Sequence, residues 1–86
     1  MAFEFDPNKS VANKKKHGID FVEAQGIWDD PDRLEVPARM QGEKRFVLIG
    51  KIAGMHWSAV FTPRAENFRI ISVRRARKQE VEAYES

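Results

Sequence analysis

The chain of 86 residues carries 15 Lys and Arg against 13 Asp and Glu, which gives a formal net charge of +2, and it contains no cysteine. This length allows one domain, residues 1–86, and excludes a doubly wound nucleotide-binding domain or a barrel of eight βα units. The lack of cysteine excludes disulfides, thiolate metal sites and a cysteine nucleophile. No apolar run approaches the roughly 20 residues of a membrane span. We therefore expect a soluble cytoplasmic domain with no signal peptide and no membrane contact.

The first part of the chain predicts a short strand and a helix. Residues 3–5 alternate apolar and polar side chains, as a strand does. Asp6 is a good N-cap, and Pro7 suits the first helical position. This helix should end at His17, because Gly18 readily adopts the left-handed conformation that terminates helices.

A second helix is predicted after a capping box made by Asp20 and Glu23. Phe21, Ala24 and Trp28 follow at helical spacing and form an apolar stripe. The acidic, proline-containing segment 29–32 cannot continue the helix and favours a solvated turn.

From residue 33 the apolar period changes from helical to alternating. Strands are expected over 33–36, 44–52, 55–62 and 68–73, with a loop around Gln41 and Gly42 and a hairpin turn at 53–54. Residues 75–85 return to a helical composition. The predicted order is βααββββα, an α+β fold with an antiparallel sheet, two N-terminal helices and a C-terminal helix.

The sequence contains no pattern for a metal or a cofactor, and we expect neither. The two histidines, His17 and His56, are far apart in the chain and belong to no cluster of ligand residues. The aspartates of 29–32 lack the ligand spacing of a calcium loop. The five glycines are scattered, so no phosphate-cradling loop is present.

The charge is distributed unevenly. Residues 1–43 carry six basic and nine acidic side chains, whereas residues 44–86 carry nine basic and four acidic ones. Segment 69–78 alone holds five cations. Guanidinium groups match phosphate geometry, so an anionic partner such as nucleic acid is one interpretation. The alternative is that these arginines only protect sheet edges from aggregation.

Strand alternation predicts which of these arginines share a face. A regular strand puts Arg69 and Arg75 on one side and Arg74 on the other. Arg69 and Arg74 could then act together only if a bulge or the strand end intervened. Arg45 and Arg64 lie on or beside the neighbouring strands.

Several other side chains have both a structural and a functional interpretation. Trp57 and Phe61 could stack on bases, but together with Met55 and Ala59 they favour a core. His17 is either a helix-end residue or a general acid or base. Tyr84 either docks the last helix or hydrogen-bonds RNA.

Several segments, taken together, resemble one known family. They are Phe-Glu-Phe-Asp-Pro-Asn-Lys at 3–9, Lys-His-Gly-Ile-Asp-Phe-Val-Glu-Ala at 16–24, Asp-Asp-Pro at 29–31, Gly-Glu-Lys-Arg-Phe-Val-Leu-Ile-Gly at 42–50 and Arg-Ile-Ile-Ser-Val-Arg-Arg-Ala at 69–76. In order and spacing they are similar to BrnT-type toxins, with Glu80 and Tyr84 matching the closing helix. Two positions depart from the family: Pro63 replaces a frequent acidic residue, and Phe61 a frequent Tyr or His.

The resemblance implies a RelE-like ribonuclease of a bacterial type II toxin–antitoxin module, which inhibits translation by cutting RNA. It also implies a ribbon-helix-helix antitoxin through which the complex binds operator DNA. The positions that the resemblance carries over as functional are Arg45, Arg64, Arg69, Arg74 and Tyr84, with His17.

Metal-independent cleavage fits these residues, because the RNA 2′-OH supplies the nucleophile. We expect Arg74 and Arg69 to stabilise the phosphorane charge, with Arg45, Arg64 and Arg75 binding the RNA backbone. His17, Tyr84 and Glu80 all stay open as acid or base. The alternatives are a non-catalytic nucleic-acid-binding module and a protein whose basic half receives an acidic partner.

Overall fold

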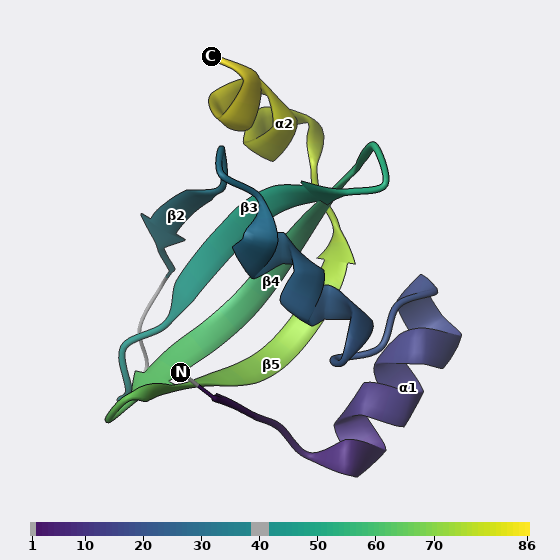
Figure 1. Ribbon diagram of the computed structural model, residues 1–86, viewed down its shortest axis with the longest axis vertical. Helices are drawn as coiled ribbons and strands as arrows, with labels where there is room; N and C mark the ends of the chain where they lie inside the picture. The colour runs from purple at the N-terminus through teal and green to yellow at the C-terminus, as the bar shows by residue number, and fades with distance from the viewer. Residues whose placement is uncertain (1, 39–41) are drawn as a thin grey trace.

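The computed structural model describes residues 2–38 and 42–86, and it has an α+β fold built on one five-stranded sheet (Figure 1). In chain order the elements are β1 (Phe3–Glu4), α1 (Pro7–His17), the 3-10 helix η1 (Glu23–Asp29), β2 (Leu34–Pro37), β3 (Phe46–Ile52), β4 (Met55–Arg64), β5 (Asn67–Arg75) and α2 (Lys78–Glu85). The strand order in the sheet is β1-β5-β4-β3-β2. The predicted α+β class is therefore confirmed. Gln41, in the predicted loop, lies outside the described residues.

The sheet is mixed, so the prediction of a purely antiparallel sheet was wrong. β1 pairs parallel to β5, with Phe3 opposite Phe68, whereas the other neighbouring strands are antiparallel. Alternation of side chains carries no information on strand direction. A parallel pair is possible here because a long connection, containing both N-terminal helices, separates the two strands.

The two ends of α1 follow the sequence prediction. The Asn8 amide donates to Asp6 Oδ1 at 2.8 Å, and Pro7 occupies the first turn. Gly18 has φ 81°, and its amide donates to the Lys14 carbonyl at 2.9 Å. A residue with a Cβ is strained at this φ, so glycine is the natural terminator of α1.

The second helix begins as predicted but has a different form. Asp20 and Glu23 make the capping box, with the Glu23 amide donating to Asp20 Oδ1 at 2.7 Å and the Asp20 amide to Glu23 Oε1 at 3.0 Å. The segment that follows is a 3-10 helix rather than an α-helix. Close packing on the sheet accompanies this tighter winding: a Cβ on Gly50 of β3 would lie 3.0 Å from the Ile27 side chain and 3.3 Å from the Ile27 carbonyl oxygen.

The hydrophobic core lies between η1 and one face of the sheet, which we call the helical face. Ile27 on η1 and Ala59 and Phe61 on β4 are at most 1% exposed. The Phe61 ring lies 5.3 Å from the Trp28 ring and 5.2 Å from the Phe68 ring. The core interpretation of Trp57, Ala59 and Phe61 is confirmed. Met55 was wrongly included, because it starts β4 beside the hairpin turn and is 41% exposed.

A β-bulge changes the faces of β5. Val60 is opposite Ser72, but the next residue, Phe61, is opposite Ile70, so Ile71 has no partner on β4. One extra residue reverses the alternation along the bulged strand. Because directly opposite residues project from the same face of an antiparallel pair, Arg69, which faces Thr62, lies on the same side as Arg74, which faces Ser58.

The regular alternation predicted for β5 was therefore wrong. Arg75, opposite Trp57, lies on the helical face. Arg69 and Arg74 lie together on the other face. The bulge, left open as a possibility by the sequence, is the physical reason.

α1 covers the edge of β5 beyond the short strand β1. The buried Asn13 side chain accepts from the Val73 amide at 3.2 Å and donates to the Val73 carbonyl at 2.9 Å. It also donates to the Ile19 carbonyl at 2.8 Å. One asparagine thus satisfies both backbone groups of an edge residue, which would otherwise be open to another strand.

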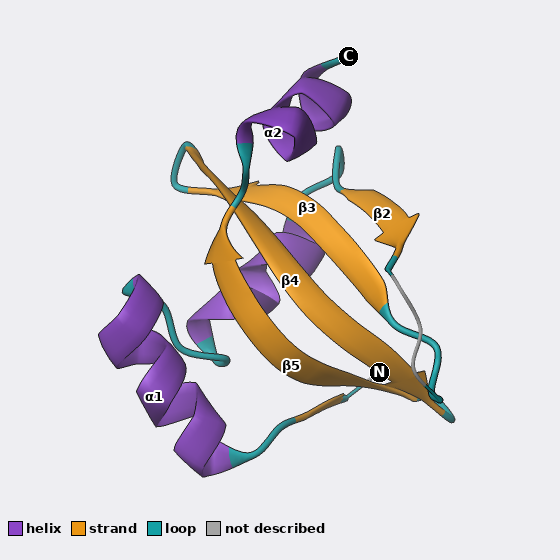
Figure 2. Ribbon diagram, turned by 180° about the vertical axis from the view of Figure 1, so that it is seen from behind, coloured by secondary structure: helices purple, strands orange, loops and turns teal. Residues whose placement is uncertain are grey.

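Among the described residues, no helix covers most of the length of the sheet face that points away from η1 (Figure 2). We call this face the open face. α2 lies over it at one end. No residue of α2 is fully buried, so this helix is held to the sheet by contacts at its margin. None of the described helices is long and apolar enough to cross a membrane.

Candidate functional site

The strand register defines which side chains project from the open face. On β4 and β5 the polar ones are His56, Ser58, Thr62, Arg64, Asn67, Arg69, Ser72 and Arg74. The helical face of the same strands is apolar except at Arg75. The open face therefore gathers the polar and charged side chains of these strands, of which Ser58 and Thr62 are themselves buried.

Arg74 is the most firmly held of these side chains. Its Nη1 and Nη2 donate to the two carboxylate oxygens of Glu80 on α2 at 2.7 and 2.9 Å. The Ser58 hydroxyl and the Arg77 amide also donate to Glu80 Oε1, at 3.0 and 2.7 Å. These hydrogen bonds, the one from Arg74 above all, lower the pKa of Glu80 to about 2, against the opposing effect of burial. Glu80 is thus a permanent anion at neutral pH and ties α2 to β4 and β5.

Arg69 is held less firmly than Arg74. Its nearest carboxylate oxygen is Glu4 Oε1 on β1, at 3.9 Å, and its side chain is 35% exposed. Glu4 also accepts a hydrogen bond from Asn67 at 3.0 Å. A weak, half-exposed ion pair leaves the Arg69 guanidinium available to another anion.

The remaining predicted arginines lie farther along the sheet or on its other face. Arg45, just before β3, and Arg64, at the end of β4, are both exposed at the end of the sheet far from α2. Arg64 pairs with Glu43 at 3.1 Å. Arg75, on the helical face, lies 5.4 Å from the centre of the Trp57 ring in a cation–π contact. The structure thus brings Arg69 and Arg74 onto one face and leaves Arg75 on the other.

Tyr84 connects α2 to the turn before β2. Its hydroxyl donates to Asp30 Oδ2 at 2.6 Å, and this bond raises the pKa of Tyr84 to about 12. Desolvation works to raise the pKa of Asp30, but hydrogen bonds from Tyr84 and from the Lys51 and Asp32 amides outweigh it and keep that pKa below its ordinary value. Asp30 is therefore a structural anchor rather than a solvated turn residue.

His17 lies apart from the arginine pair. It is the last residue of α1, which packs beside β5 through Asn13. Within residues 2–38 and 42–86 it makes no ion pair or side-chain hydrogen bond with any arginine. The geometry therefore supports its interpretation as a helix-end residue next to Gly18.

His56 was overlooked as a functional candidate. Its Nε2 lies 2.7 Å from Glu85 Oε2, and its ring meets the Tyr84 ring edge-on at 5.3 Å between centroids. Lys51, opposite His56 on β3, lies 3.4 Å from the same Glu85 oxygen. The alternation of residues 55–62 could have found it, because it puts His56 on the same side as Ser58.

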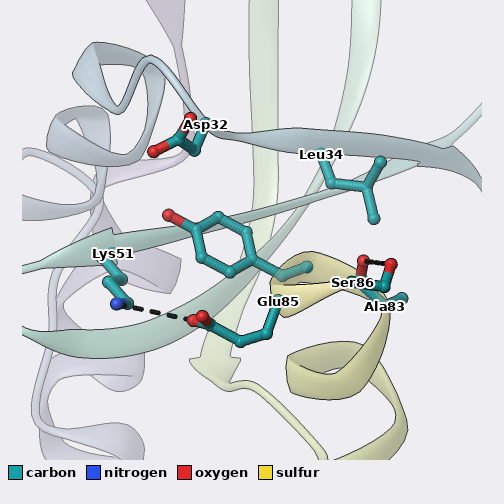
Figure 3. Close-up of a pocket in the computed structure, with 7 residues that line it drawn as sticks. Asp32, Leu34, Lys51, Ala83, Glu85 and Ser86 are labelled. Carbon is teal, nitrogen blue, oxygen red and sulfur yellow. Dashed lines mark hydrogen bonds and ion pairs between the residues drawn. The ribbon is translucent and has the colours of Figure 1, made fainter.

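A shallow hollow of about 530 Å³ adjoins this cluster, between the end of α2, Lys51 and the start of β2 (Figure 3). Figure 3 shows Lys51 reaching towards Glu85, with Asp32 and Leu34 on the opposite wall. Among the described residues, no group of three or more His, Asp or Glu is arranged to hold a metal ion. The hollow is lined by charges of both signs.

A small α+β domain with arginines on an uncovered sheet face has the features of a protein that acts on a polyanion such as nucleic acid. The comparison with protein families makes this specific. The model of the BrnT family, the ribonuclease toxins of type II toxin–antitoxin systems, matches residues 5–80, and the chain belongs to this family. The resemblance noted in the sequence is confirmed.

Family membership sets the general role. A ribonuclease toxin acts on RNA, and a type II system pairs the toxin with a protein antitoxin. A search of curated proteins found no match.

Proposed function

We propose that this toxin is a metal-independent endoribonuclease that binds RNA along its open face and inhibits translation by cutting it. The observation that carries the proposal is the bulge at Ile71, which puts Arg69 and Arg74 on the same face, open over most of its length and bordered by α2 at Arg74. The RNA 2′-OH is the nucleophile, so the protein has to supply cations, proton transfer and a fixed geometry.

Arg74 is the proposed stabiliser of charge at the scissile phosphate. A guanidinium has five donors, and Glu80 takes two of them, so Arg74 keeps donors for a phosphate while its position is fixed. Fixed donors aimed at developing charge are the most effective kind. The acidic partner limits how freely Arg74 moves but leaves it charged.

Arg69 is proposed to hold a neighbouring part of the RNA. It lies five residues from Arg74, roughly 15 Å between Cα atoms on a strand, so the two arginines contact different phosphates. Arg45 and Arg64 extend the basic track to the far end of the sheet. Arg75 and His17 lie off the open face, and the proposal gives them no contact with the scissile phosphate.

The test is cleavage of RNA by purified, antitoxin-free protein in EDTA. We expect cleavage, with kcat/KM reduced roughly 10- to 100-fold in Arg69→Ala, because a charge-assisted hydrogen bond is worth about 1.5–3 kcal/mol. Arg74→Ala should lose roughly 100-fold or more. Arg75→Ala is the matched control: the same substitution on the same strand, but on the helical face.

Two results would contradict the proposal. Intact RNA at high protein concentration rules out the nuclease, and steeply salt-dependent binding without cleavage identifies a non-catalytic RNA-binding module. Equal losses in Arg69→Ala and Arg75→Ala would refute the assignment of the open face. Circular dichroism of each variant separates loss of function from loss of fold.

We also propose that the antitoxin is a ribbon-helix-helix protein, through which the complex binds its operator DNA. The basic character of residues 44–86 supports an acidic toxin-binding segment in that partner. Co-expression with the adjacent open reading frame, followed by size exclusion, tests the pairing. One co-eluting complex that protects operator DNA is expected, and two separate peaks would refute it.

A further inference from the structure

We infer that His56 is the proton-transfer group of RNA cleavage and that Glu85 is the positioning residue that holds its ring. The inference rests on the proposed nuclease function and adds to it a residue that the sequence pattern did not single out. It is carried by the location of His56 on the open face and by its contact with a carboxylate.

The other candidates for general acid or base are already held in strong hydrogen bonds. Glu80 is held by Arg74, Ser58 and the Arg77 amide, and its pKa of about 2 makes it a weak base. Tyr84 is bonded to Asp30, and its pKa of about 12 makes it a weak acid at neutral pH. Proton transfer needs a group that changes its charge near neutral pH, as imidazole does.

His56 lies where RNA held by Arg74 would pass. It precedes Ser58 by two residues on β4, and Ser58 is directly opposite Arg74. Residues two apart on a strand share a face and lie roughly 7 Å apart. The His56 side chain is 22% exposed, so it is partly enclosed but can be reached from the open face.

The contact with Glu85 fixes the state of the ring. The hydrogen bond from His56 lowers the pKa of Glu85, so this carboxylate is ionised and can only accept. When the ring is neutral, Nε2 is therefore the nitrogen that carries the proton, and the lone pair is at Nδ1. Among the described residues, Nδ1 has no hydrogen-bond partner. In a known catalytic arrangement, a carboxylate accepts a hydrogen bond from one imidazole nitrogen and orients the ring so that the other nitrogen can transfer a proton.

The charges around His56 oppose one another. Glu85 on α2 favours the imidazolium, whereas Lys51, opposite on β3, and Arg74 on β5 disfavour it. Glu80 on α2 offsets Arg74, and the Tyr84 ring covers one side without charge. Charged groups of both signs therefore lie around His56.

The proposed step transfers one proton through His56 and replaces the bond from phosphorus to the 5′-oxygen with one to the 2′-oxygen. Nδ1 of His56 takes the proton of the 2′-OH while the 2′-oxygen attacks phosphorus and the bond from phosphorus to the 5′-oxygen breaks. The imidazolium then gives that proton to the 5′-oxygen. The products are a 2′,3′-cyclic phosphate and a free 5′-hydroxyl, with no net change in the protein.

The experiment is the pH–rate profile of cleavage in EDTA, measured together with RNA affinity by fluorescence anisotropy. His56→Gln should lower kcat about 100- to 10,000-fold with RNA affinity within about threefold, and the acidic limb of the profile should disappear. His17→Gln is the matched control and should keep both rate and profile.

Glu85→Gln keeps His56 and tests its positioning. The rate should fall less than in His56→Gln, and the acidic limb should move to lower pH because the imidazolium has lost its carboxylate. If His56→Gln fails to fold, the shift of the acidic limb in Glu85→Gln tests the inference by itself. An active His56→Gln protein with an intact acidic limb, or an unshifted limb in Glu85→Gln, would overturn the inference. A wild-type protein that cleaves no RNA would overturn the proposed function itself.

Discussion

The two faces of one sheet differ sharply, although the same strands build both. On β4, Phe61 is 1% exposed in the aromatic core, whereas its neighbour Val60 is only half-buried on the open face. On β5, Arg75 rests on the Trp57 ring, whereas Arg74 faces the other way and binds Glu80. A domain of this size has material for one core only. The face that carries no core is the one on which we propose that RNA binds.

The two faces are also stabilised by different kinds of interaction. The helical face is held by apolar packing, which involves no titrating group. α2, at the end of the open face, is held by ion pairs and hydrogen bonds from Glu80, Tyr84 and Glu85. Variants on the helical face should therefore change stability, and variants on the open face should change activity or its dependence on pH.

The largest effect on stability is expected from neighbouring truncations on β4. Phe61→Ala should lower the free energy of unfolding by about 3–5 kcal/mol, because it removes a ring packed against Trp28 and Phe68. Val60→Ala, one residue away on the open face, should cost only about 1 kcal/mol. Urea unfolding followed by tryptophan fluorescence measures both. Equal losses would mean that the open face carries a second core.

The next effect concerns the edge where α1 joins β5. Asn13→Ala should cost about 2–3 kcal/mol, because it leaves both backbone groups of Val73 and the Ile19 carbonyl without their partner. Hydrogen exchange of the Val73 amide should accelerate. The control is Asn8→Ala on the same helix, whose exposed side chain should change stability by less than about 0.5 kcal/mol. An Asn13 variant as stable as the Asn8 variant would contradict this role.

The smallest effect depends on pH and concerns α2. The pKa of Glu80 is lowered from 4.5 in the unfolded chain to about 2, so its contribution is fully present above about pH 5 and is lost as the pH falls towards 2. Glu80→Gln should therefore destabilise by about 1–2 kcal/mol at pH 7, allowing for solvent screening. The difference from wild type should shrink steadily below pH 5 and be small at pH 2.

Denaturant titrations between pH 2 and 7 measure this dependence. Glu82→Gln, an exposed position on the same helix, is the control and should follow wild type throughout. A constant difference between Glu80→Gln and wild type at all pH values would show that shape, rather than charge, links α2 to the sheet.

Much of the fold could be predicted because its signals are local. The caps at Asp6 and Gly18, the Asp20–Glu23 capping box and the alternation in residues 44–62 each depend on neighbours in the chain. The candidate site could be predicted only in part. Arginine content indicated an anionic ligand, but the assignment of faces failed at Ile71, since a bulge depends on how β4 and β5 register with one another.

His56 was missed for a related reason. Its partner Glu85 is 29 residues away, on a helix whose docking no local pattern predicts. Tyr84 and Glu80 were recognised, but their partners Asp30 and Ser58 were not, and those partners change what the two groups can do chemically. Proton affinity is set by neighbours in space, which sequence spacing does not give.

The sequence by itself determined the α+β class, the helix ends, the family and the concentration of positive charge in the second half of the chain. These properties depend on composition, on period and on short-range hydrogen bonds. Only the tertiary structure decided that Arg69 and Arg74 share the open face, that Arg75 does not, and that His56 meets Glu85 there. Those facts depend on strand register and on the docking of α2, which are set by contacts between residues far apart in the chain.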